Sequence, residues 1–336
     1  MKNITLIYGG GAIGSFVANC LIYSNHKVFF LCRGENYKTI KNKGLDLKIF
    51  NNNKLLRKFN LKDEGDFKVI NNLKIIKGLK FDNIFITTKI NENLKKIFYN
   101  IEPFINQKTL IVTPCTAIPF WWFLCLKKSF KVDKKIIKRL DPIFKKNLNR
   151  KNLVGMTMWL SGKLYNPGKV AIKHIQRGLP MKEVHSSRRN QVNKLRKDIS
   201  RICISPIVKN IYSEIFNKSI NSLAFNVVAL KYKQNNKHLS KNPKAKNEIL
   251  KILKEGDLIL KKNKIKIYQS PKSRIKQTLK STKHTMSMLY AFKNKKKIEL
   301  KELWSSFEIL IKNINLKMPF TKKIVNEVKS KLYESI

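Results

Sequence analysis

The sequence predicts two domains of different class: an α/β domain built on a parallel sheet, followed by an all-helical domain. In the first half, short β-rich apolar runs recur, and a glycine-rich turn directly follows the first of them. From residue 210 onward, apolar residues recur at helical spacing and few strand signals remain. The length of 336 residues also favours two domains, because single cores stop growing at about 250–300 residues. We therefore expect domains at 1–206 and 207–336.

The first fifty residues have the pattern strand, glycine-rich turn, helix and strand. Apolar strands are predicted at 4–8 and 27–32, with a helix at 15–23 between them. In the G-x-G-x-x-G motif, Gly9 allows the turn, Gly11 lets the backbone approach a pyrophosphate, and Gly14 permits close helix–strand packing. This context predicts a Rossmann dinucleotide-binding domain, with phosphates at the helix N-terminus. The expected phosphate-binding residues are Gly9, Gly10, Gly11, Ala12, Ile13 and Gly14.

The end of the second strand indicates the cofactor. An NAD site usually places Asp or Glu there to hold the ribose 2′-hydroxyl. Here Arg33 follows the strand, and a guanidinium suits a 2′-phosphate through a bidentate contact. We therefore predict NADP(H), although Glu35 two residues on leaves NAD open, and a solvated surface arginine is the alternative interpretation of Arg33.

The rest of the first domain is predicted to complete the sheet. Strands are expected at 82–89 and 108–115, and Lys89 at the carboxyl end of the first is a candidate cofactor contact because ligands bind at that edge. The aromatic run at 118–123 is typical of a core. Residues 127–150 are lysine-rich and read as a basic insertion. Strands at 154–160 and 168–174, around the turn at 166–168, should extend the sheet.

The second half should consist of helices. Their expected positions are 211–233, 245–262, 299–313 and 320–333, with a polar loop at 231–246. A nucleotide domain followed by a helical domain favours an active site in the cleft between them.

The charge of the chain is unusual. It has 71 Lys and Arg against 21 Asp and Glu, a formal net charge of +50. Such an excess is typical of proteins that bind nucleic acid or anionic membranes. However, lysine outnumbers arginine 61 to 10, as in chains from AT-rich genomes. The basic residues are scattered and no recognition module is evident, so we expect a compositional background and no specific nucleic-acid partner.

Composition also argues against several classes of protein. The most apolar uncharged stretch, 109–126, is interrupted by Pro114 and Pro119, so we expect no membrane span. The five cysteines lack C-x-x-C spacing and the five histidines lack H-E-x-x-H, which argues against a metal site or disulfide framework. The cysteine usage indicates a reducing compartment, so we expect a cytoplasmic protein.

Several motifs together resemble those of one enzyme family. In the first half they are the glycine motif, the segment RGEN at 33–36, the run IPFWWF at 118–123 and YNPGKV at 165–170. In the second half they are FNK at 216–218 with AFN at 224–226, TMSML at 285–289 and IEL at 298–300. With these motifs, residues 1–332 resemble the ketopantoate reductase (2-dehydropantoate 2-reductase) family.

The resemblance implies roles for individual residues. Lys218 corresponds to the general acid, and Glu299 to the acidic residue that orients it and contacts the nicotinamide ribose. Partial burial suits a lysine to this task, because it lowers the pKa toward working pH. Ser287, Asn226 and Asn236 correspond to substrate-binding residues.

The sequence departs from the family pattern around the same pocket. Thr116-Ala117 replaces an Asn-Gly whose asparagine touches both nicotinamide and substrate, and Ser222 replaces a further substrate asparagine. Tyr290-Ala291 replaces a Gln-Asp pair. We therefore expect Thr116 to contact cofactor and substrate and Ser222 to contact substrate, as the replaced asparagines do. The contacts should differ in kind, because a hydroxyl lacks the amide's paired donor and acceptor.

The reaction that the resemblance implies is NADPH-dependent reduction of a 2-keto acid. The expected case is 2-dehydropantoate to pantoate, which feeds pantothenate and coenzyme A synthesis, with a homodimer as the candidate assembly. Two alternatives stay open: a related hydroxyacid or sugar-phosphate dehydrogenase with another substrate, and a catalytically weakened protein that binds nucleotide, or nucleic acid non-specifically.

Overall fold

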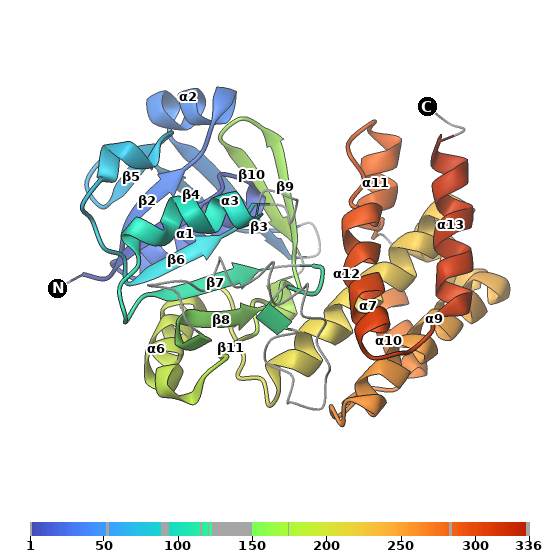
Figure 1. Cartoon of the computed structure of the whole chain (residues 1–336). Helices are drawn as coiled ribbons and strands as arrows, with labels where there is room; N and C mark the ends of the chain where they lie inside the picture. Colours follow the sequence, from blue (N-terminus) through green and yellow to red (C-terminus); the bar gives the residue numbers. More distant parts are fainter. Residues whose placement is uncertain are drawn as a thin grey trace. The chain divides into compact units, whose positions relative to one another are not determined.

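A computed structural model describes residues 2–51, 54–88, 94–114, 116–119, 121–122, 150–173, 175–281 and 284–333 (Figure 1). The chain divides into two compact units. The first unit comprises Met1–Cys115 and Lys138–Ile211, and the second comprises Thr116–Ile137 and Tyr212–Ile336. The chain thus passes into the helical unit after Ile211, whereas residue 206 was expected. The predicted basic insertion at 127–150 lies almost wholly outside the described residues.

A seven-stranded sheet forms the centre of the first unit, in the order β11-β8-β7-β6-β1-β2-β5. Its strands are β1 (Ile4–Tyr8), β2 (Lys27–Leu31), β5 (Phe67–Ile70), β6 (Asn83–Ile86), β7 (Leu110–Pro114), β8 (Leu153–Met156) and β11 (Met181–Glu183). All neighbours pair parallel except β11, which runs antiparallel to β8. The order of the six parallel strands is that of a Rossmann fold, which confirms the predicted class.

The order of the strands reverses between β1 and β6, which creates a switch point at their carboxyl ends. Both strands are continuous apolar runs and are almost wholly buried. This pattern is typical of a parallel sheet that is covered on both faces. The glycine-rich turn follows β1 directly. The fold therefore places this turn where open α/β sheets bind ligands.

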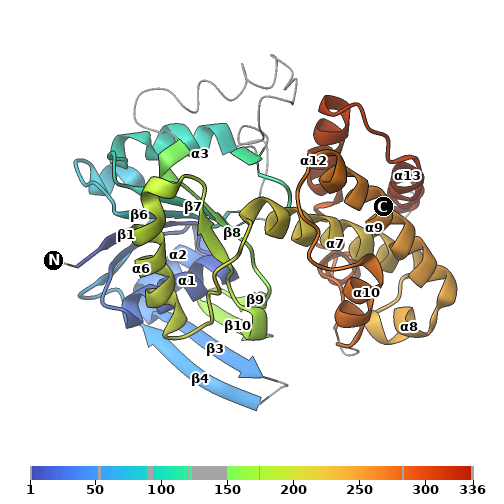
Figure 2. The same ribbon diagram turned by 90° about the horizontal axis from the view of Figure 1, so that it is seen from below.

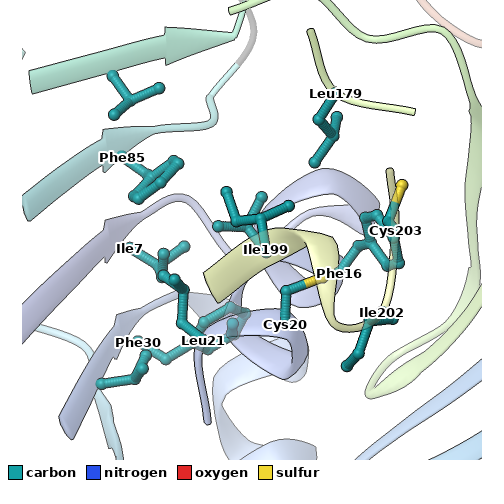
Figure 3. Packing of buried hydrophobic residues seen from close by; sticks show 14 of the residues in the cluster. Ile7, Phe16, Cys20, Leu21, Phe30, Phe85, Leu179, Ile199, Ile202 and Cys203 are labelled. Atoms are coloured by element: carbon teal, nitrogen blue, oxygen red, sulfur yellow. The ribbon is translucent and has the colours of Figure 1, made fainter. Parts of the chain in front are cut away.

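Helices cover both faces of this sheet. In the first unit they are α1 (Ala12–Tyr23), α2 (Gly34–Lys43), α3 (Leu94–Ile101) and α6 (Arg189–Ser200). Figure 2 shows α3 on the face opposite α1 and α6. In Figure 3, Phe16 and Cys20 of α1 pack with Ile199 of α6 against strand residues such as Ile7 and Phe30.

A buried polar chain also joins α6 to the sheet. His26 Nε2 lies 3.1 Å from the Asp198 carboxylate, and its Nδ1 lies 3.2 Å from Thr5 Oγ1. Thr5 and His26 are buried and Asp198 is nearly so, so these hydrogen bonds fix α6 against β1.

A second sheet of four strands has the order β4-β3-β10-β9. Its strands are β3 (Leu45–Asn51), β4 (Lys54–Leu61), β9 (Ser161–Asn166) and β10 (Lys169–Lys173). The expectation that the strand at 168–174 extends the central sheet is therefore wrong, because β10 pairs parallel with β3 instead. β3 alternates buried and half-buried residues, so one face of the strand packs on the core. One edge of β3 pairs with β4 and the other with β10.

The described strands all belong to the first unit, and the second unit is helical (Figure 1). Its helices are α7 (Ile211–Tyr232), α8 (Asn236–Lys241), α9 (Pro243–Lys262), α10 (Pro271–Leu279), α11 (Ser287–Lys293), α12 (Leu300–Asn313) and α13 (Pro319–Tyr333). This confirms the four predicted helices. The predicted loop at 231–246 is wrong in part, since α8 forms within it.

The predicted role of the aromatic run is confirmed where it is described. Trp121 and Trp122 are completely buried, and Trp122 Nε1 donates to the Tyr212 carbonyl at 3.0 Å. Trp122 also stacks at a tilt on Phe216 of α7, with ring centroids 6.0 Å apart. These rings therefore belong to the core of the second unit.

None of the helices in the described residues is long and apolar enough to cross a membrane.

Candidate active site

Steric limits shape the glycine-rich turn at the carboxyl end of β1. Gly9 has φ +126°, and a Cβ on Gly14 would lie 2.0 Å from the Gly9 carbonyl oxygen. A Cβ on Gly10 would lie 2.2 Å from Cys32 Cβ, so this position is as restricted as Gly9 and Gly14. By contrast, a Cβ on Gly11 would meet nothing within 4 Å. The turn is thus packed on its inner side and open at Gly11.

The open side of the turn suits an anion. Gly11 is the N-cap of α1 and provides no side-chain hydrogen bond to the first turn, which also lacks an acidic residue. The first backbone N–H groups of a helix have no intrahelical acceptor, and the helix dipole favours negative charge there. Ala12 and Ile13 form this first turn. The arrangement therefore fits the pyrophosphate of a dinucleotide.

Two side chains hold the carbonyl groups of the turn. Thr87 Oγ1, just after β6, donates to the Gly9 carbonyl at 2.8 Å. Asn36 Nδ2 donates to the Gly10 carbonyl at 2.6 Å, while its Oδ1 accepts from Gly168 N at 2.7 Å. Asn36 therefore joins the turn to the β9–β10 connection of the second sheet. Neither role was predicted from the sequence, although each residue follows the carboxyl end of a strand.

Arg33 lies at the expected position. It is exposed, directly follows Cys32 after β2, and forms the N-cap of α2. Glu35, the competing acid, accepts from Lys38 at 2.8 Å, and this bond raises the pKa of the Lys38 ammonium. Lys89 lies outside the described residues, so its predicted contact stays a prediction.

The second unit carries the residues predicted for proton transfer and substrate. Lys218, Ser222 and Asn226 are four residues apart on α7, so they lie along one face of the helix. Lys218 and Ser222 are half-buried, and Asn226 is buried. This polar row begins at Lys218 and ends at Asn226.

Asn226 joins the row to Ser287. Its Nδ2 donates to the Ser222 carbonyl at 2.8 Å, and its Oδ1 accepts from Met288 N at 2.9 Å and from Ser287 Oγ at 3.3 Å. Asn226 thereby holds the N-terminus of α11, and Ser287 remains exposed. The fold brings Ser222, Asn226 and Ser287 together, and Asn226 positions Ser287.

Asn236 has a different environment from the one expected. Its side chain is fully buried, and Nδ2 donates to the carbonyls of Thr278 and Ser281 at 2.9 and 3.1 Å. Its backbone N–H donates to the His284 carbonyl at 3.1 Å. Asn236 therefore supports the connection that leads into α11, and no surface of it is available to a substrate in this conformation.

The two remaining predicted residues also belong to the second unit. Glu299 is half-buried and is the N-cap of α12, where its carbonyl accepts from Leu303 N at 3.0 Å. α12 packs on α7 through Phe307 and Phe216, whose ring centroids lie 5.7 Å apart. Thr116 is half-buried and precedes the buried Ala117.

A buried ion pair next to the row was not predicted. Arg274 of α10 donates to Asp257 of α9 at 2.5 Å and to Asn217 Oδ1 of α7 at 3.3 Å. Asn217 immediately precedes Lys218. Burial raises the pKa of the Asp257 carboxyl, and the Arg274 charge opposes this shift. Arg274 therefore ties three helices together beside Lys218.

The fold and these residues define a class of protein: an oxidoreductase that uses a nicotinamide dinucleotide. Comparison with known families agrees. The family described as Ketopantoate reductase PanE/ApbA matches residues 5–114, and its C-terminal domain matches residues 210–332. The chain belongs to the ketopantoate reductase family.

Individual relatives support this assignment. A 2-dehydropantoate 2-reductase of Pyrococcus horikoshii is 25% identical over 322 residues, which is 95% of this chain and 91% of that protein. The crystal structure of a putative ketopantoate reductase from Ralstonia solanacearum MolK2 has a TM-score of 0.77 at 17% identity and covers 98% of this chain and 97% of its own. A D-mandelate dehydrogenase solved with NADH and anilino(oxo)acetate has a TM-score of 0.76 at 19% identity, covering 98% of both chains.

Proposed function

We propose that this enzyme reduces a 2-keto acid with NADPH, and that 2-dehydropantoate is the substrate and pantoate the product. The observation that carries this proposal is the polar row of α7, from Lys218 through Ser222 to Asn226, together with the exposed hydroxyl of Ser287 on α11, which Asn226 contacts. A row of one cation and several hydrogen-bonding groups suits a small acid that bears carbonyl and hydroxyl oxygens.

The first unit supplies the cofactor contacts of the proposal. Residues 9–14 hold the pyrophosphate, since the turn is open at Gly11 and the N-terminus of α1 is uncapped. Arg33 contacts the 2′-phosphate, which favours NADPH over NADH. Glu35 is paired with Lys38 and is a weaker rival for the ribose hydroxyls. When bound, the nicotinamide supplies the hydride for the keto carbon.

The second unit supplies the proton. As negative charge develops on the carbonyl oxygen, Lys218 donates a proton from Nζ to that oxygen, so a hydroxyl forms. Glu299 orients Lys218 and contacts the nicotinamide ribose. Ser287 donates to the substrate, and Asn226 acts by holding Ser287 in place. Thr116 and Ser222 offer further hydroxyls, whereas we no longer assign Asn236 to the substrate.

One observation favours a second candidate substrate. Tyr290 lies three residues after Ser287 on α11, where the family has an amide, and Ala291 replaces a carboxylate. An aromatic ring next to Ser287 favours an apolar substituent on the keto acid. The fold is shared with a D-mandelate dehydrogenase, so an aryl 2-keto acid is the alternative.

Kinetic assays with two cofactors and a substrate panel test the proposal. We expect oxidation of NADPH with 2-dehydropantoate, at a higher kcat/KM than with phenylglyoxylate. Arg33→Gln should raise the KM for NADPH and leave that for NADH nearly unchanged. Lys43→Gln is the matched control, because it removes an exposed cation from the far end of α2 and leaves the Lys38–Glu35 pair intact. No turnover with any keto acid would contradict the proposed function, and equal use of both cofactors by wild type would contradict the role of Arg33.

We also propose a cytoplasmic location. Cys20, Cys32 and Cys203 are buried free thiols. Burial raises the pKa values of Cys32 and Cys203 to about 12, so these thiols are unreactive. They behave as core residues, which suits a compartment that does not form disulfides.

A further inference from the structure

The helical unit also contains a cavity that is not lined by residues of α7. Residues of α8, α9 and α10 line a cavity of about 730 Å³. This volume lies within the range of small-molecule sites, which is about 300–1,000 Å³. Its apolar lining includes Leu250 of α9 and Ile275 of α10. The cavity is therefore large enough and apolar enough for an organic ligand.

The rim of this cavity is strongly cationic. Lys272 and Lys276 lie four residues apart on α10, Lys280 follows at the same interval directly after the helix, and Lys246 contributes from α9. No carboxylate lines the cavity, and none of the four lysines has an ion-pair partner in the described part of the chain. Like charges at this spacing destabilise a helix, so a bound anion would relieve the repulsion.

The position of Lys272 strengthens this argument. It lies in the first turn of α10, which contains no acidic residue. A cation is unfavourable at that end of a helix, whereas an anion is favoured. The opposite side of α10 carries Arg274, which is buried against Asp257 and Asn217. The buried ion pair therefore accounts for Arg274, whereas Lys272 has no such partner among the described residues at its unfavourable position.

We propose that this cavity binds a small aliphatic phosphate monoester. The phosphate is held by the lysines of α10, and the aliphatic body lies on Leu250 and Ile275. A second copy of the chain is not the occupant of this cavity, because with a net charge of +50 it would bring further positive charge to these lysines. A nucleic-acid backbone would satisfy the lysines but has no aliphatic body for the apolar lining.

Isothermal titration with octyl phosphate, below its micelle concentration and at physiological salt, tests the proposal. We expect one site per chain. The double variant Lys272→Gln/Lys276→Gln should weaken binding by about tenfold or more, because two charge-assisted contacts are lost. The control is Lys194→Gln/Lys197→Gln on α6, which removes the same charge from two exposed lysines. It should change the affinity by less than about twofold.

Two comparison ligands test the apolar part of the site. Inorganic phosphate and octyl glucoside should each bind at least about tenfold more weakly than octyl phosphate. Hydrogen exchange should show that octyl phosphate protects amides of α9 and α10. Absence of binding, equal weakening by the α6 control, or equal binding of inorganic phosphate would overturn the proposal, since each indicates no site or a general effect of charge.

Discussion

At the scale of single residues, the glycine-rich turn combines two separate functions. Gly9, Gly10 and Gly14 are required by packing, because any Cβ there would overlap neighbouring atoms. Gly11 is different, since the space over it is open and packing does not require it. The sequence motif predicted different functions for Gly9, Gly11 and Gly14, but it predicted no packing role for Gly10. The structure shows that role, because a Cβ on Gly10 would lie 2.2 Å from Cys32 Cβ.

This difference predicts opposite effects of two similar substitutions. Gly14→Ala should lower the free energy of unfolding by about 1–3 kcal/mol or more, because its Cβ would press on the Gly9 carbonyl. Gly11→Ala should change stability by less than about 1 kcal/mol and weaken NADPH binding instead. Urea denaturation and fluorescence titration with NADPH measure the two effects. A strongly destabilised Gly11→Ala would contradict this division.

Asn36 is expected to position the turn without contacting the substrate. Asn36→Ala removes the bonds to Gly10 and Gly168, so NADPH should bind about tenfold more weakly while kcat with saturating NADPH changes little. Asn36→Asp keeps the acceptor for Gly168 N but loses the donor to Gly10. It should therefore resemble Asn36→Ala in cofactor binding and be closer to wild type in stability. Unchanged NADPH affinity in both variants would show that Asn36 has no such role.

At the scale of elements, the strands that could be predicted from the sequence are the buried ones. β1, β2, β6 and β7 are continuous apolar runs and were predicted near their observed ends. β4 is mostly exposed, and only its half-buried residues Phe59 and Leu61 pack against the core, so its sequence shows no continuous apolar run. The pairing of β10 with β3 joins segments far apart in sequence, and local pattern contains no information about it.

The candidate site follows the same rule. Lys218, Ser222 and Asn226 have helical spacing, so their shared face could be predicted. The burial of Asn236 could not, because it depends on the connection between α10 and α11 packing over it. The hydrogen bond from Arg274 to Asn217 could not be predicted either, because nothing in the sequence distinguishes Arg274 from the many other basic residues.

The junction of α7, α9 and α10 should respond to pH once Arg274 is removed. Arg274→Met leaves the Asp257 carboxylate buried without its partner, which should cost about 3–5 kcal/mol at pH 7. The folded-state pKa of Asp257 is already raised above its ordinary value of 3.8, and loss of the guanidinium raises it further. A folded state that binds the proton more tightly loses stability as pH rises through this window.

Urea denaturation at pH 5 and pH 7 measures this effect. The variant should be closer to wild type at pH 5 than at pH 7, because Asp257 is then protonated to a greater extent. Asp257→Leu/Arg274→Met should recover much of the stability at pH 7, since neither charge remains. An Arg274→Met variant with the same deficit at both pH values would contradict the assignment to Asp257.

At the scale of the whole molecule, the net charge of +50 has no single location. Lysines line the α10 cavity, pair with Glu35 on α2 and Glu248 on α9, and cover exposed strands. Binding to DNA should therefore be non-specific. Its affinity should fall by about 10³-fold or more between 50 and 200 mM salt. Fluorescence anisotropy with two unrelated duplexes measures this, and sequence preference at physiological salt would contradict it.

The central claim is that Lys218 donates the proton in an NADPH-dependent reduction. The most direct measurement is the oxidation of NADPH with 2-dehydropantoate by wild type, Lys218→Ala and the control Lys237→Ala, an exposed lysine of α8. We expect Lys218→Ala to lower kcat by about 10²-fold or more while still binding NADPH, and Lys237→Ala to retain wild-type activity. Turnover by Lys218→Ala at the wild-type rate would contradict it.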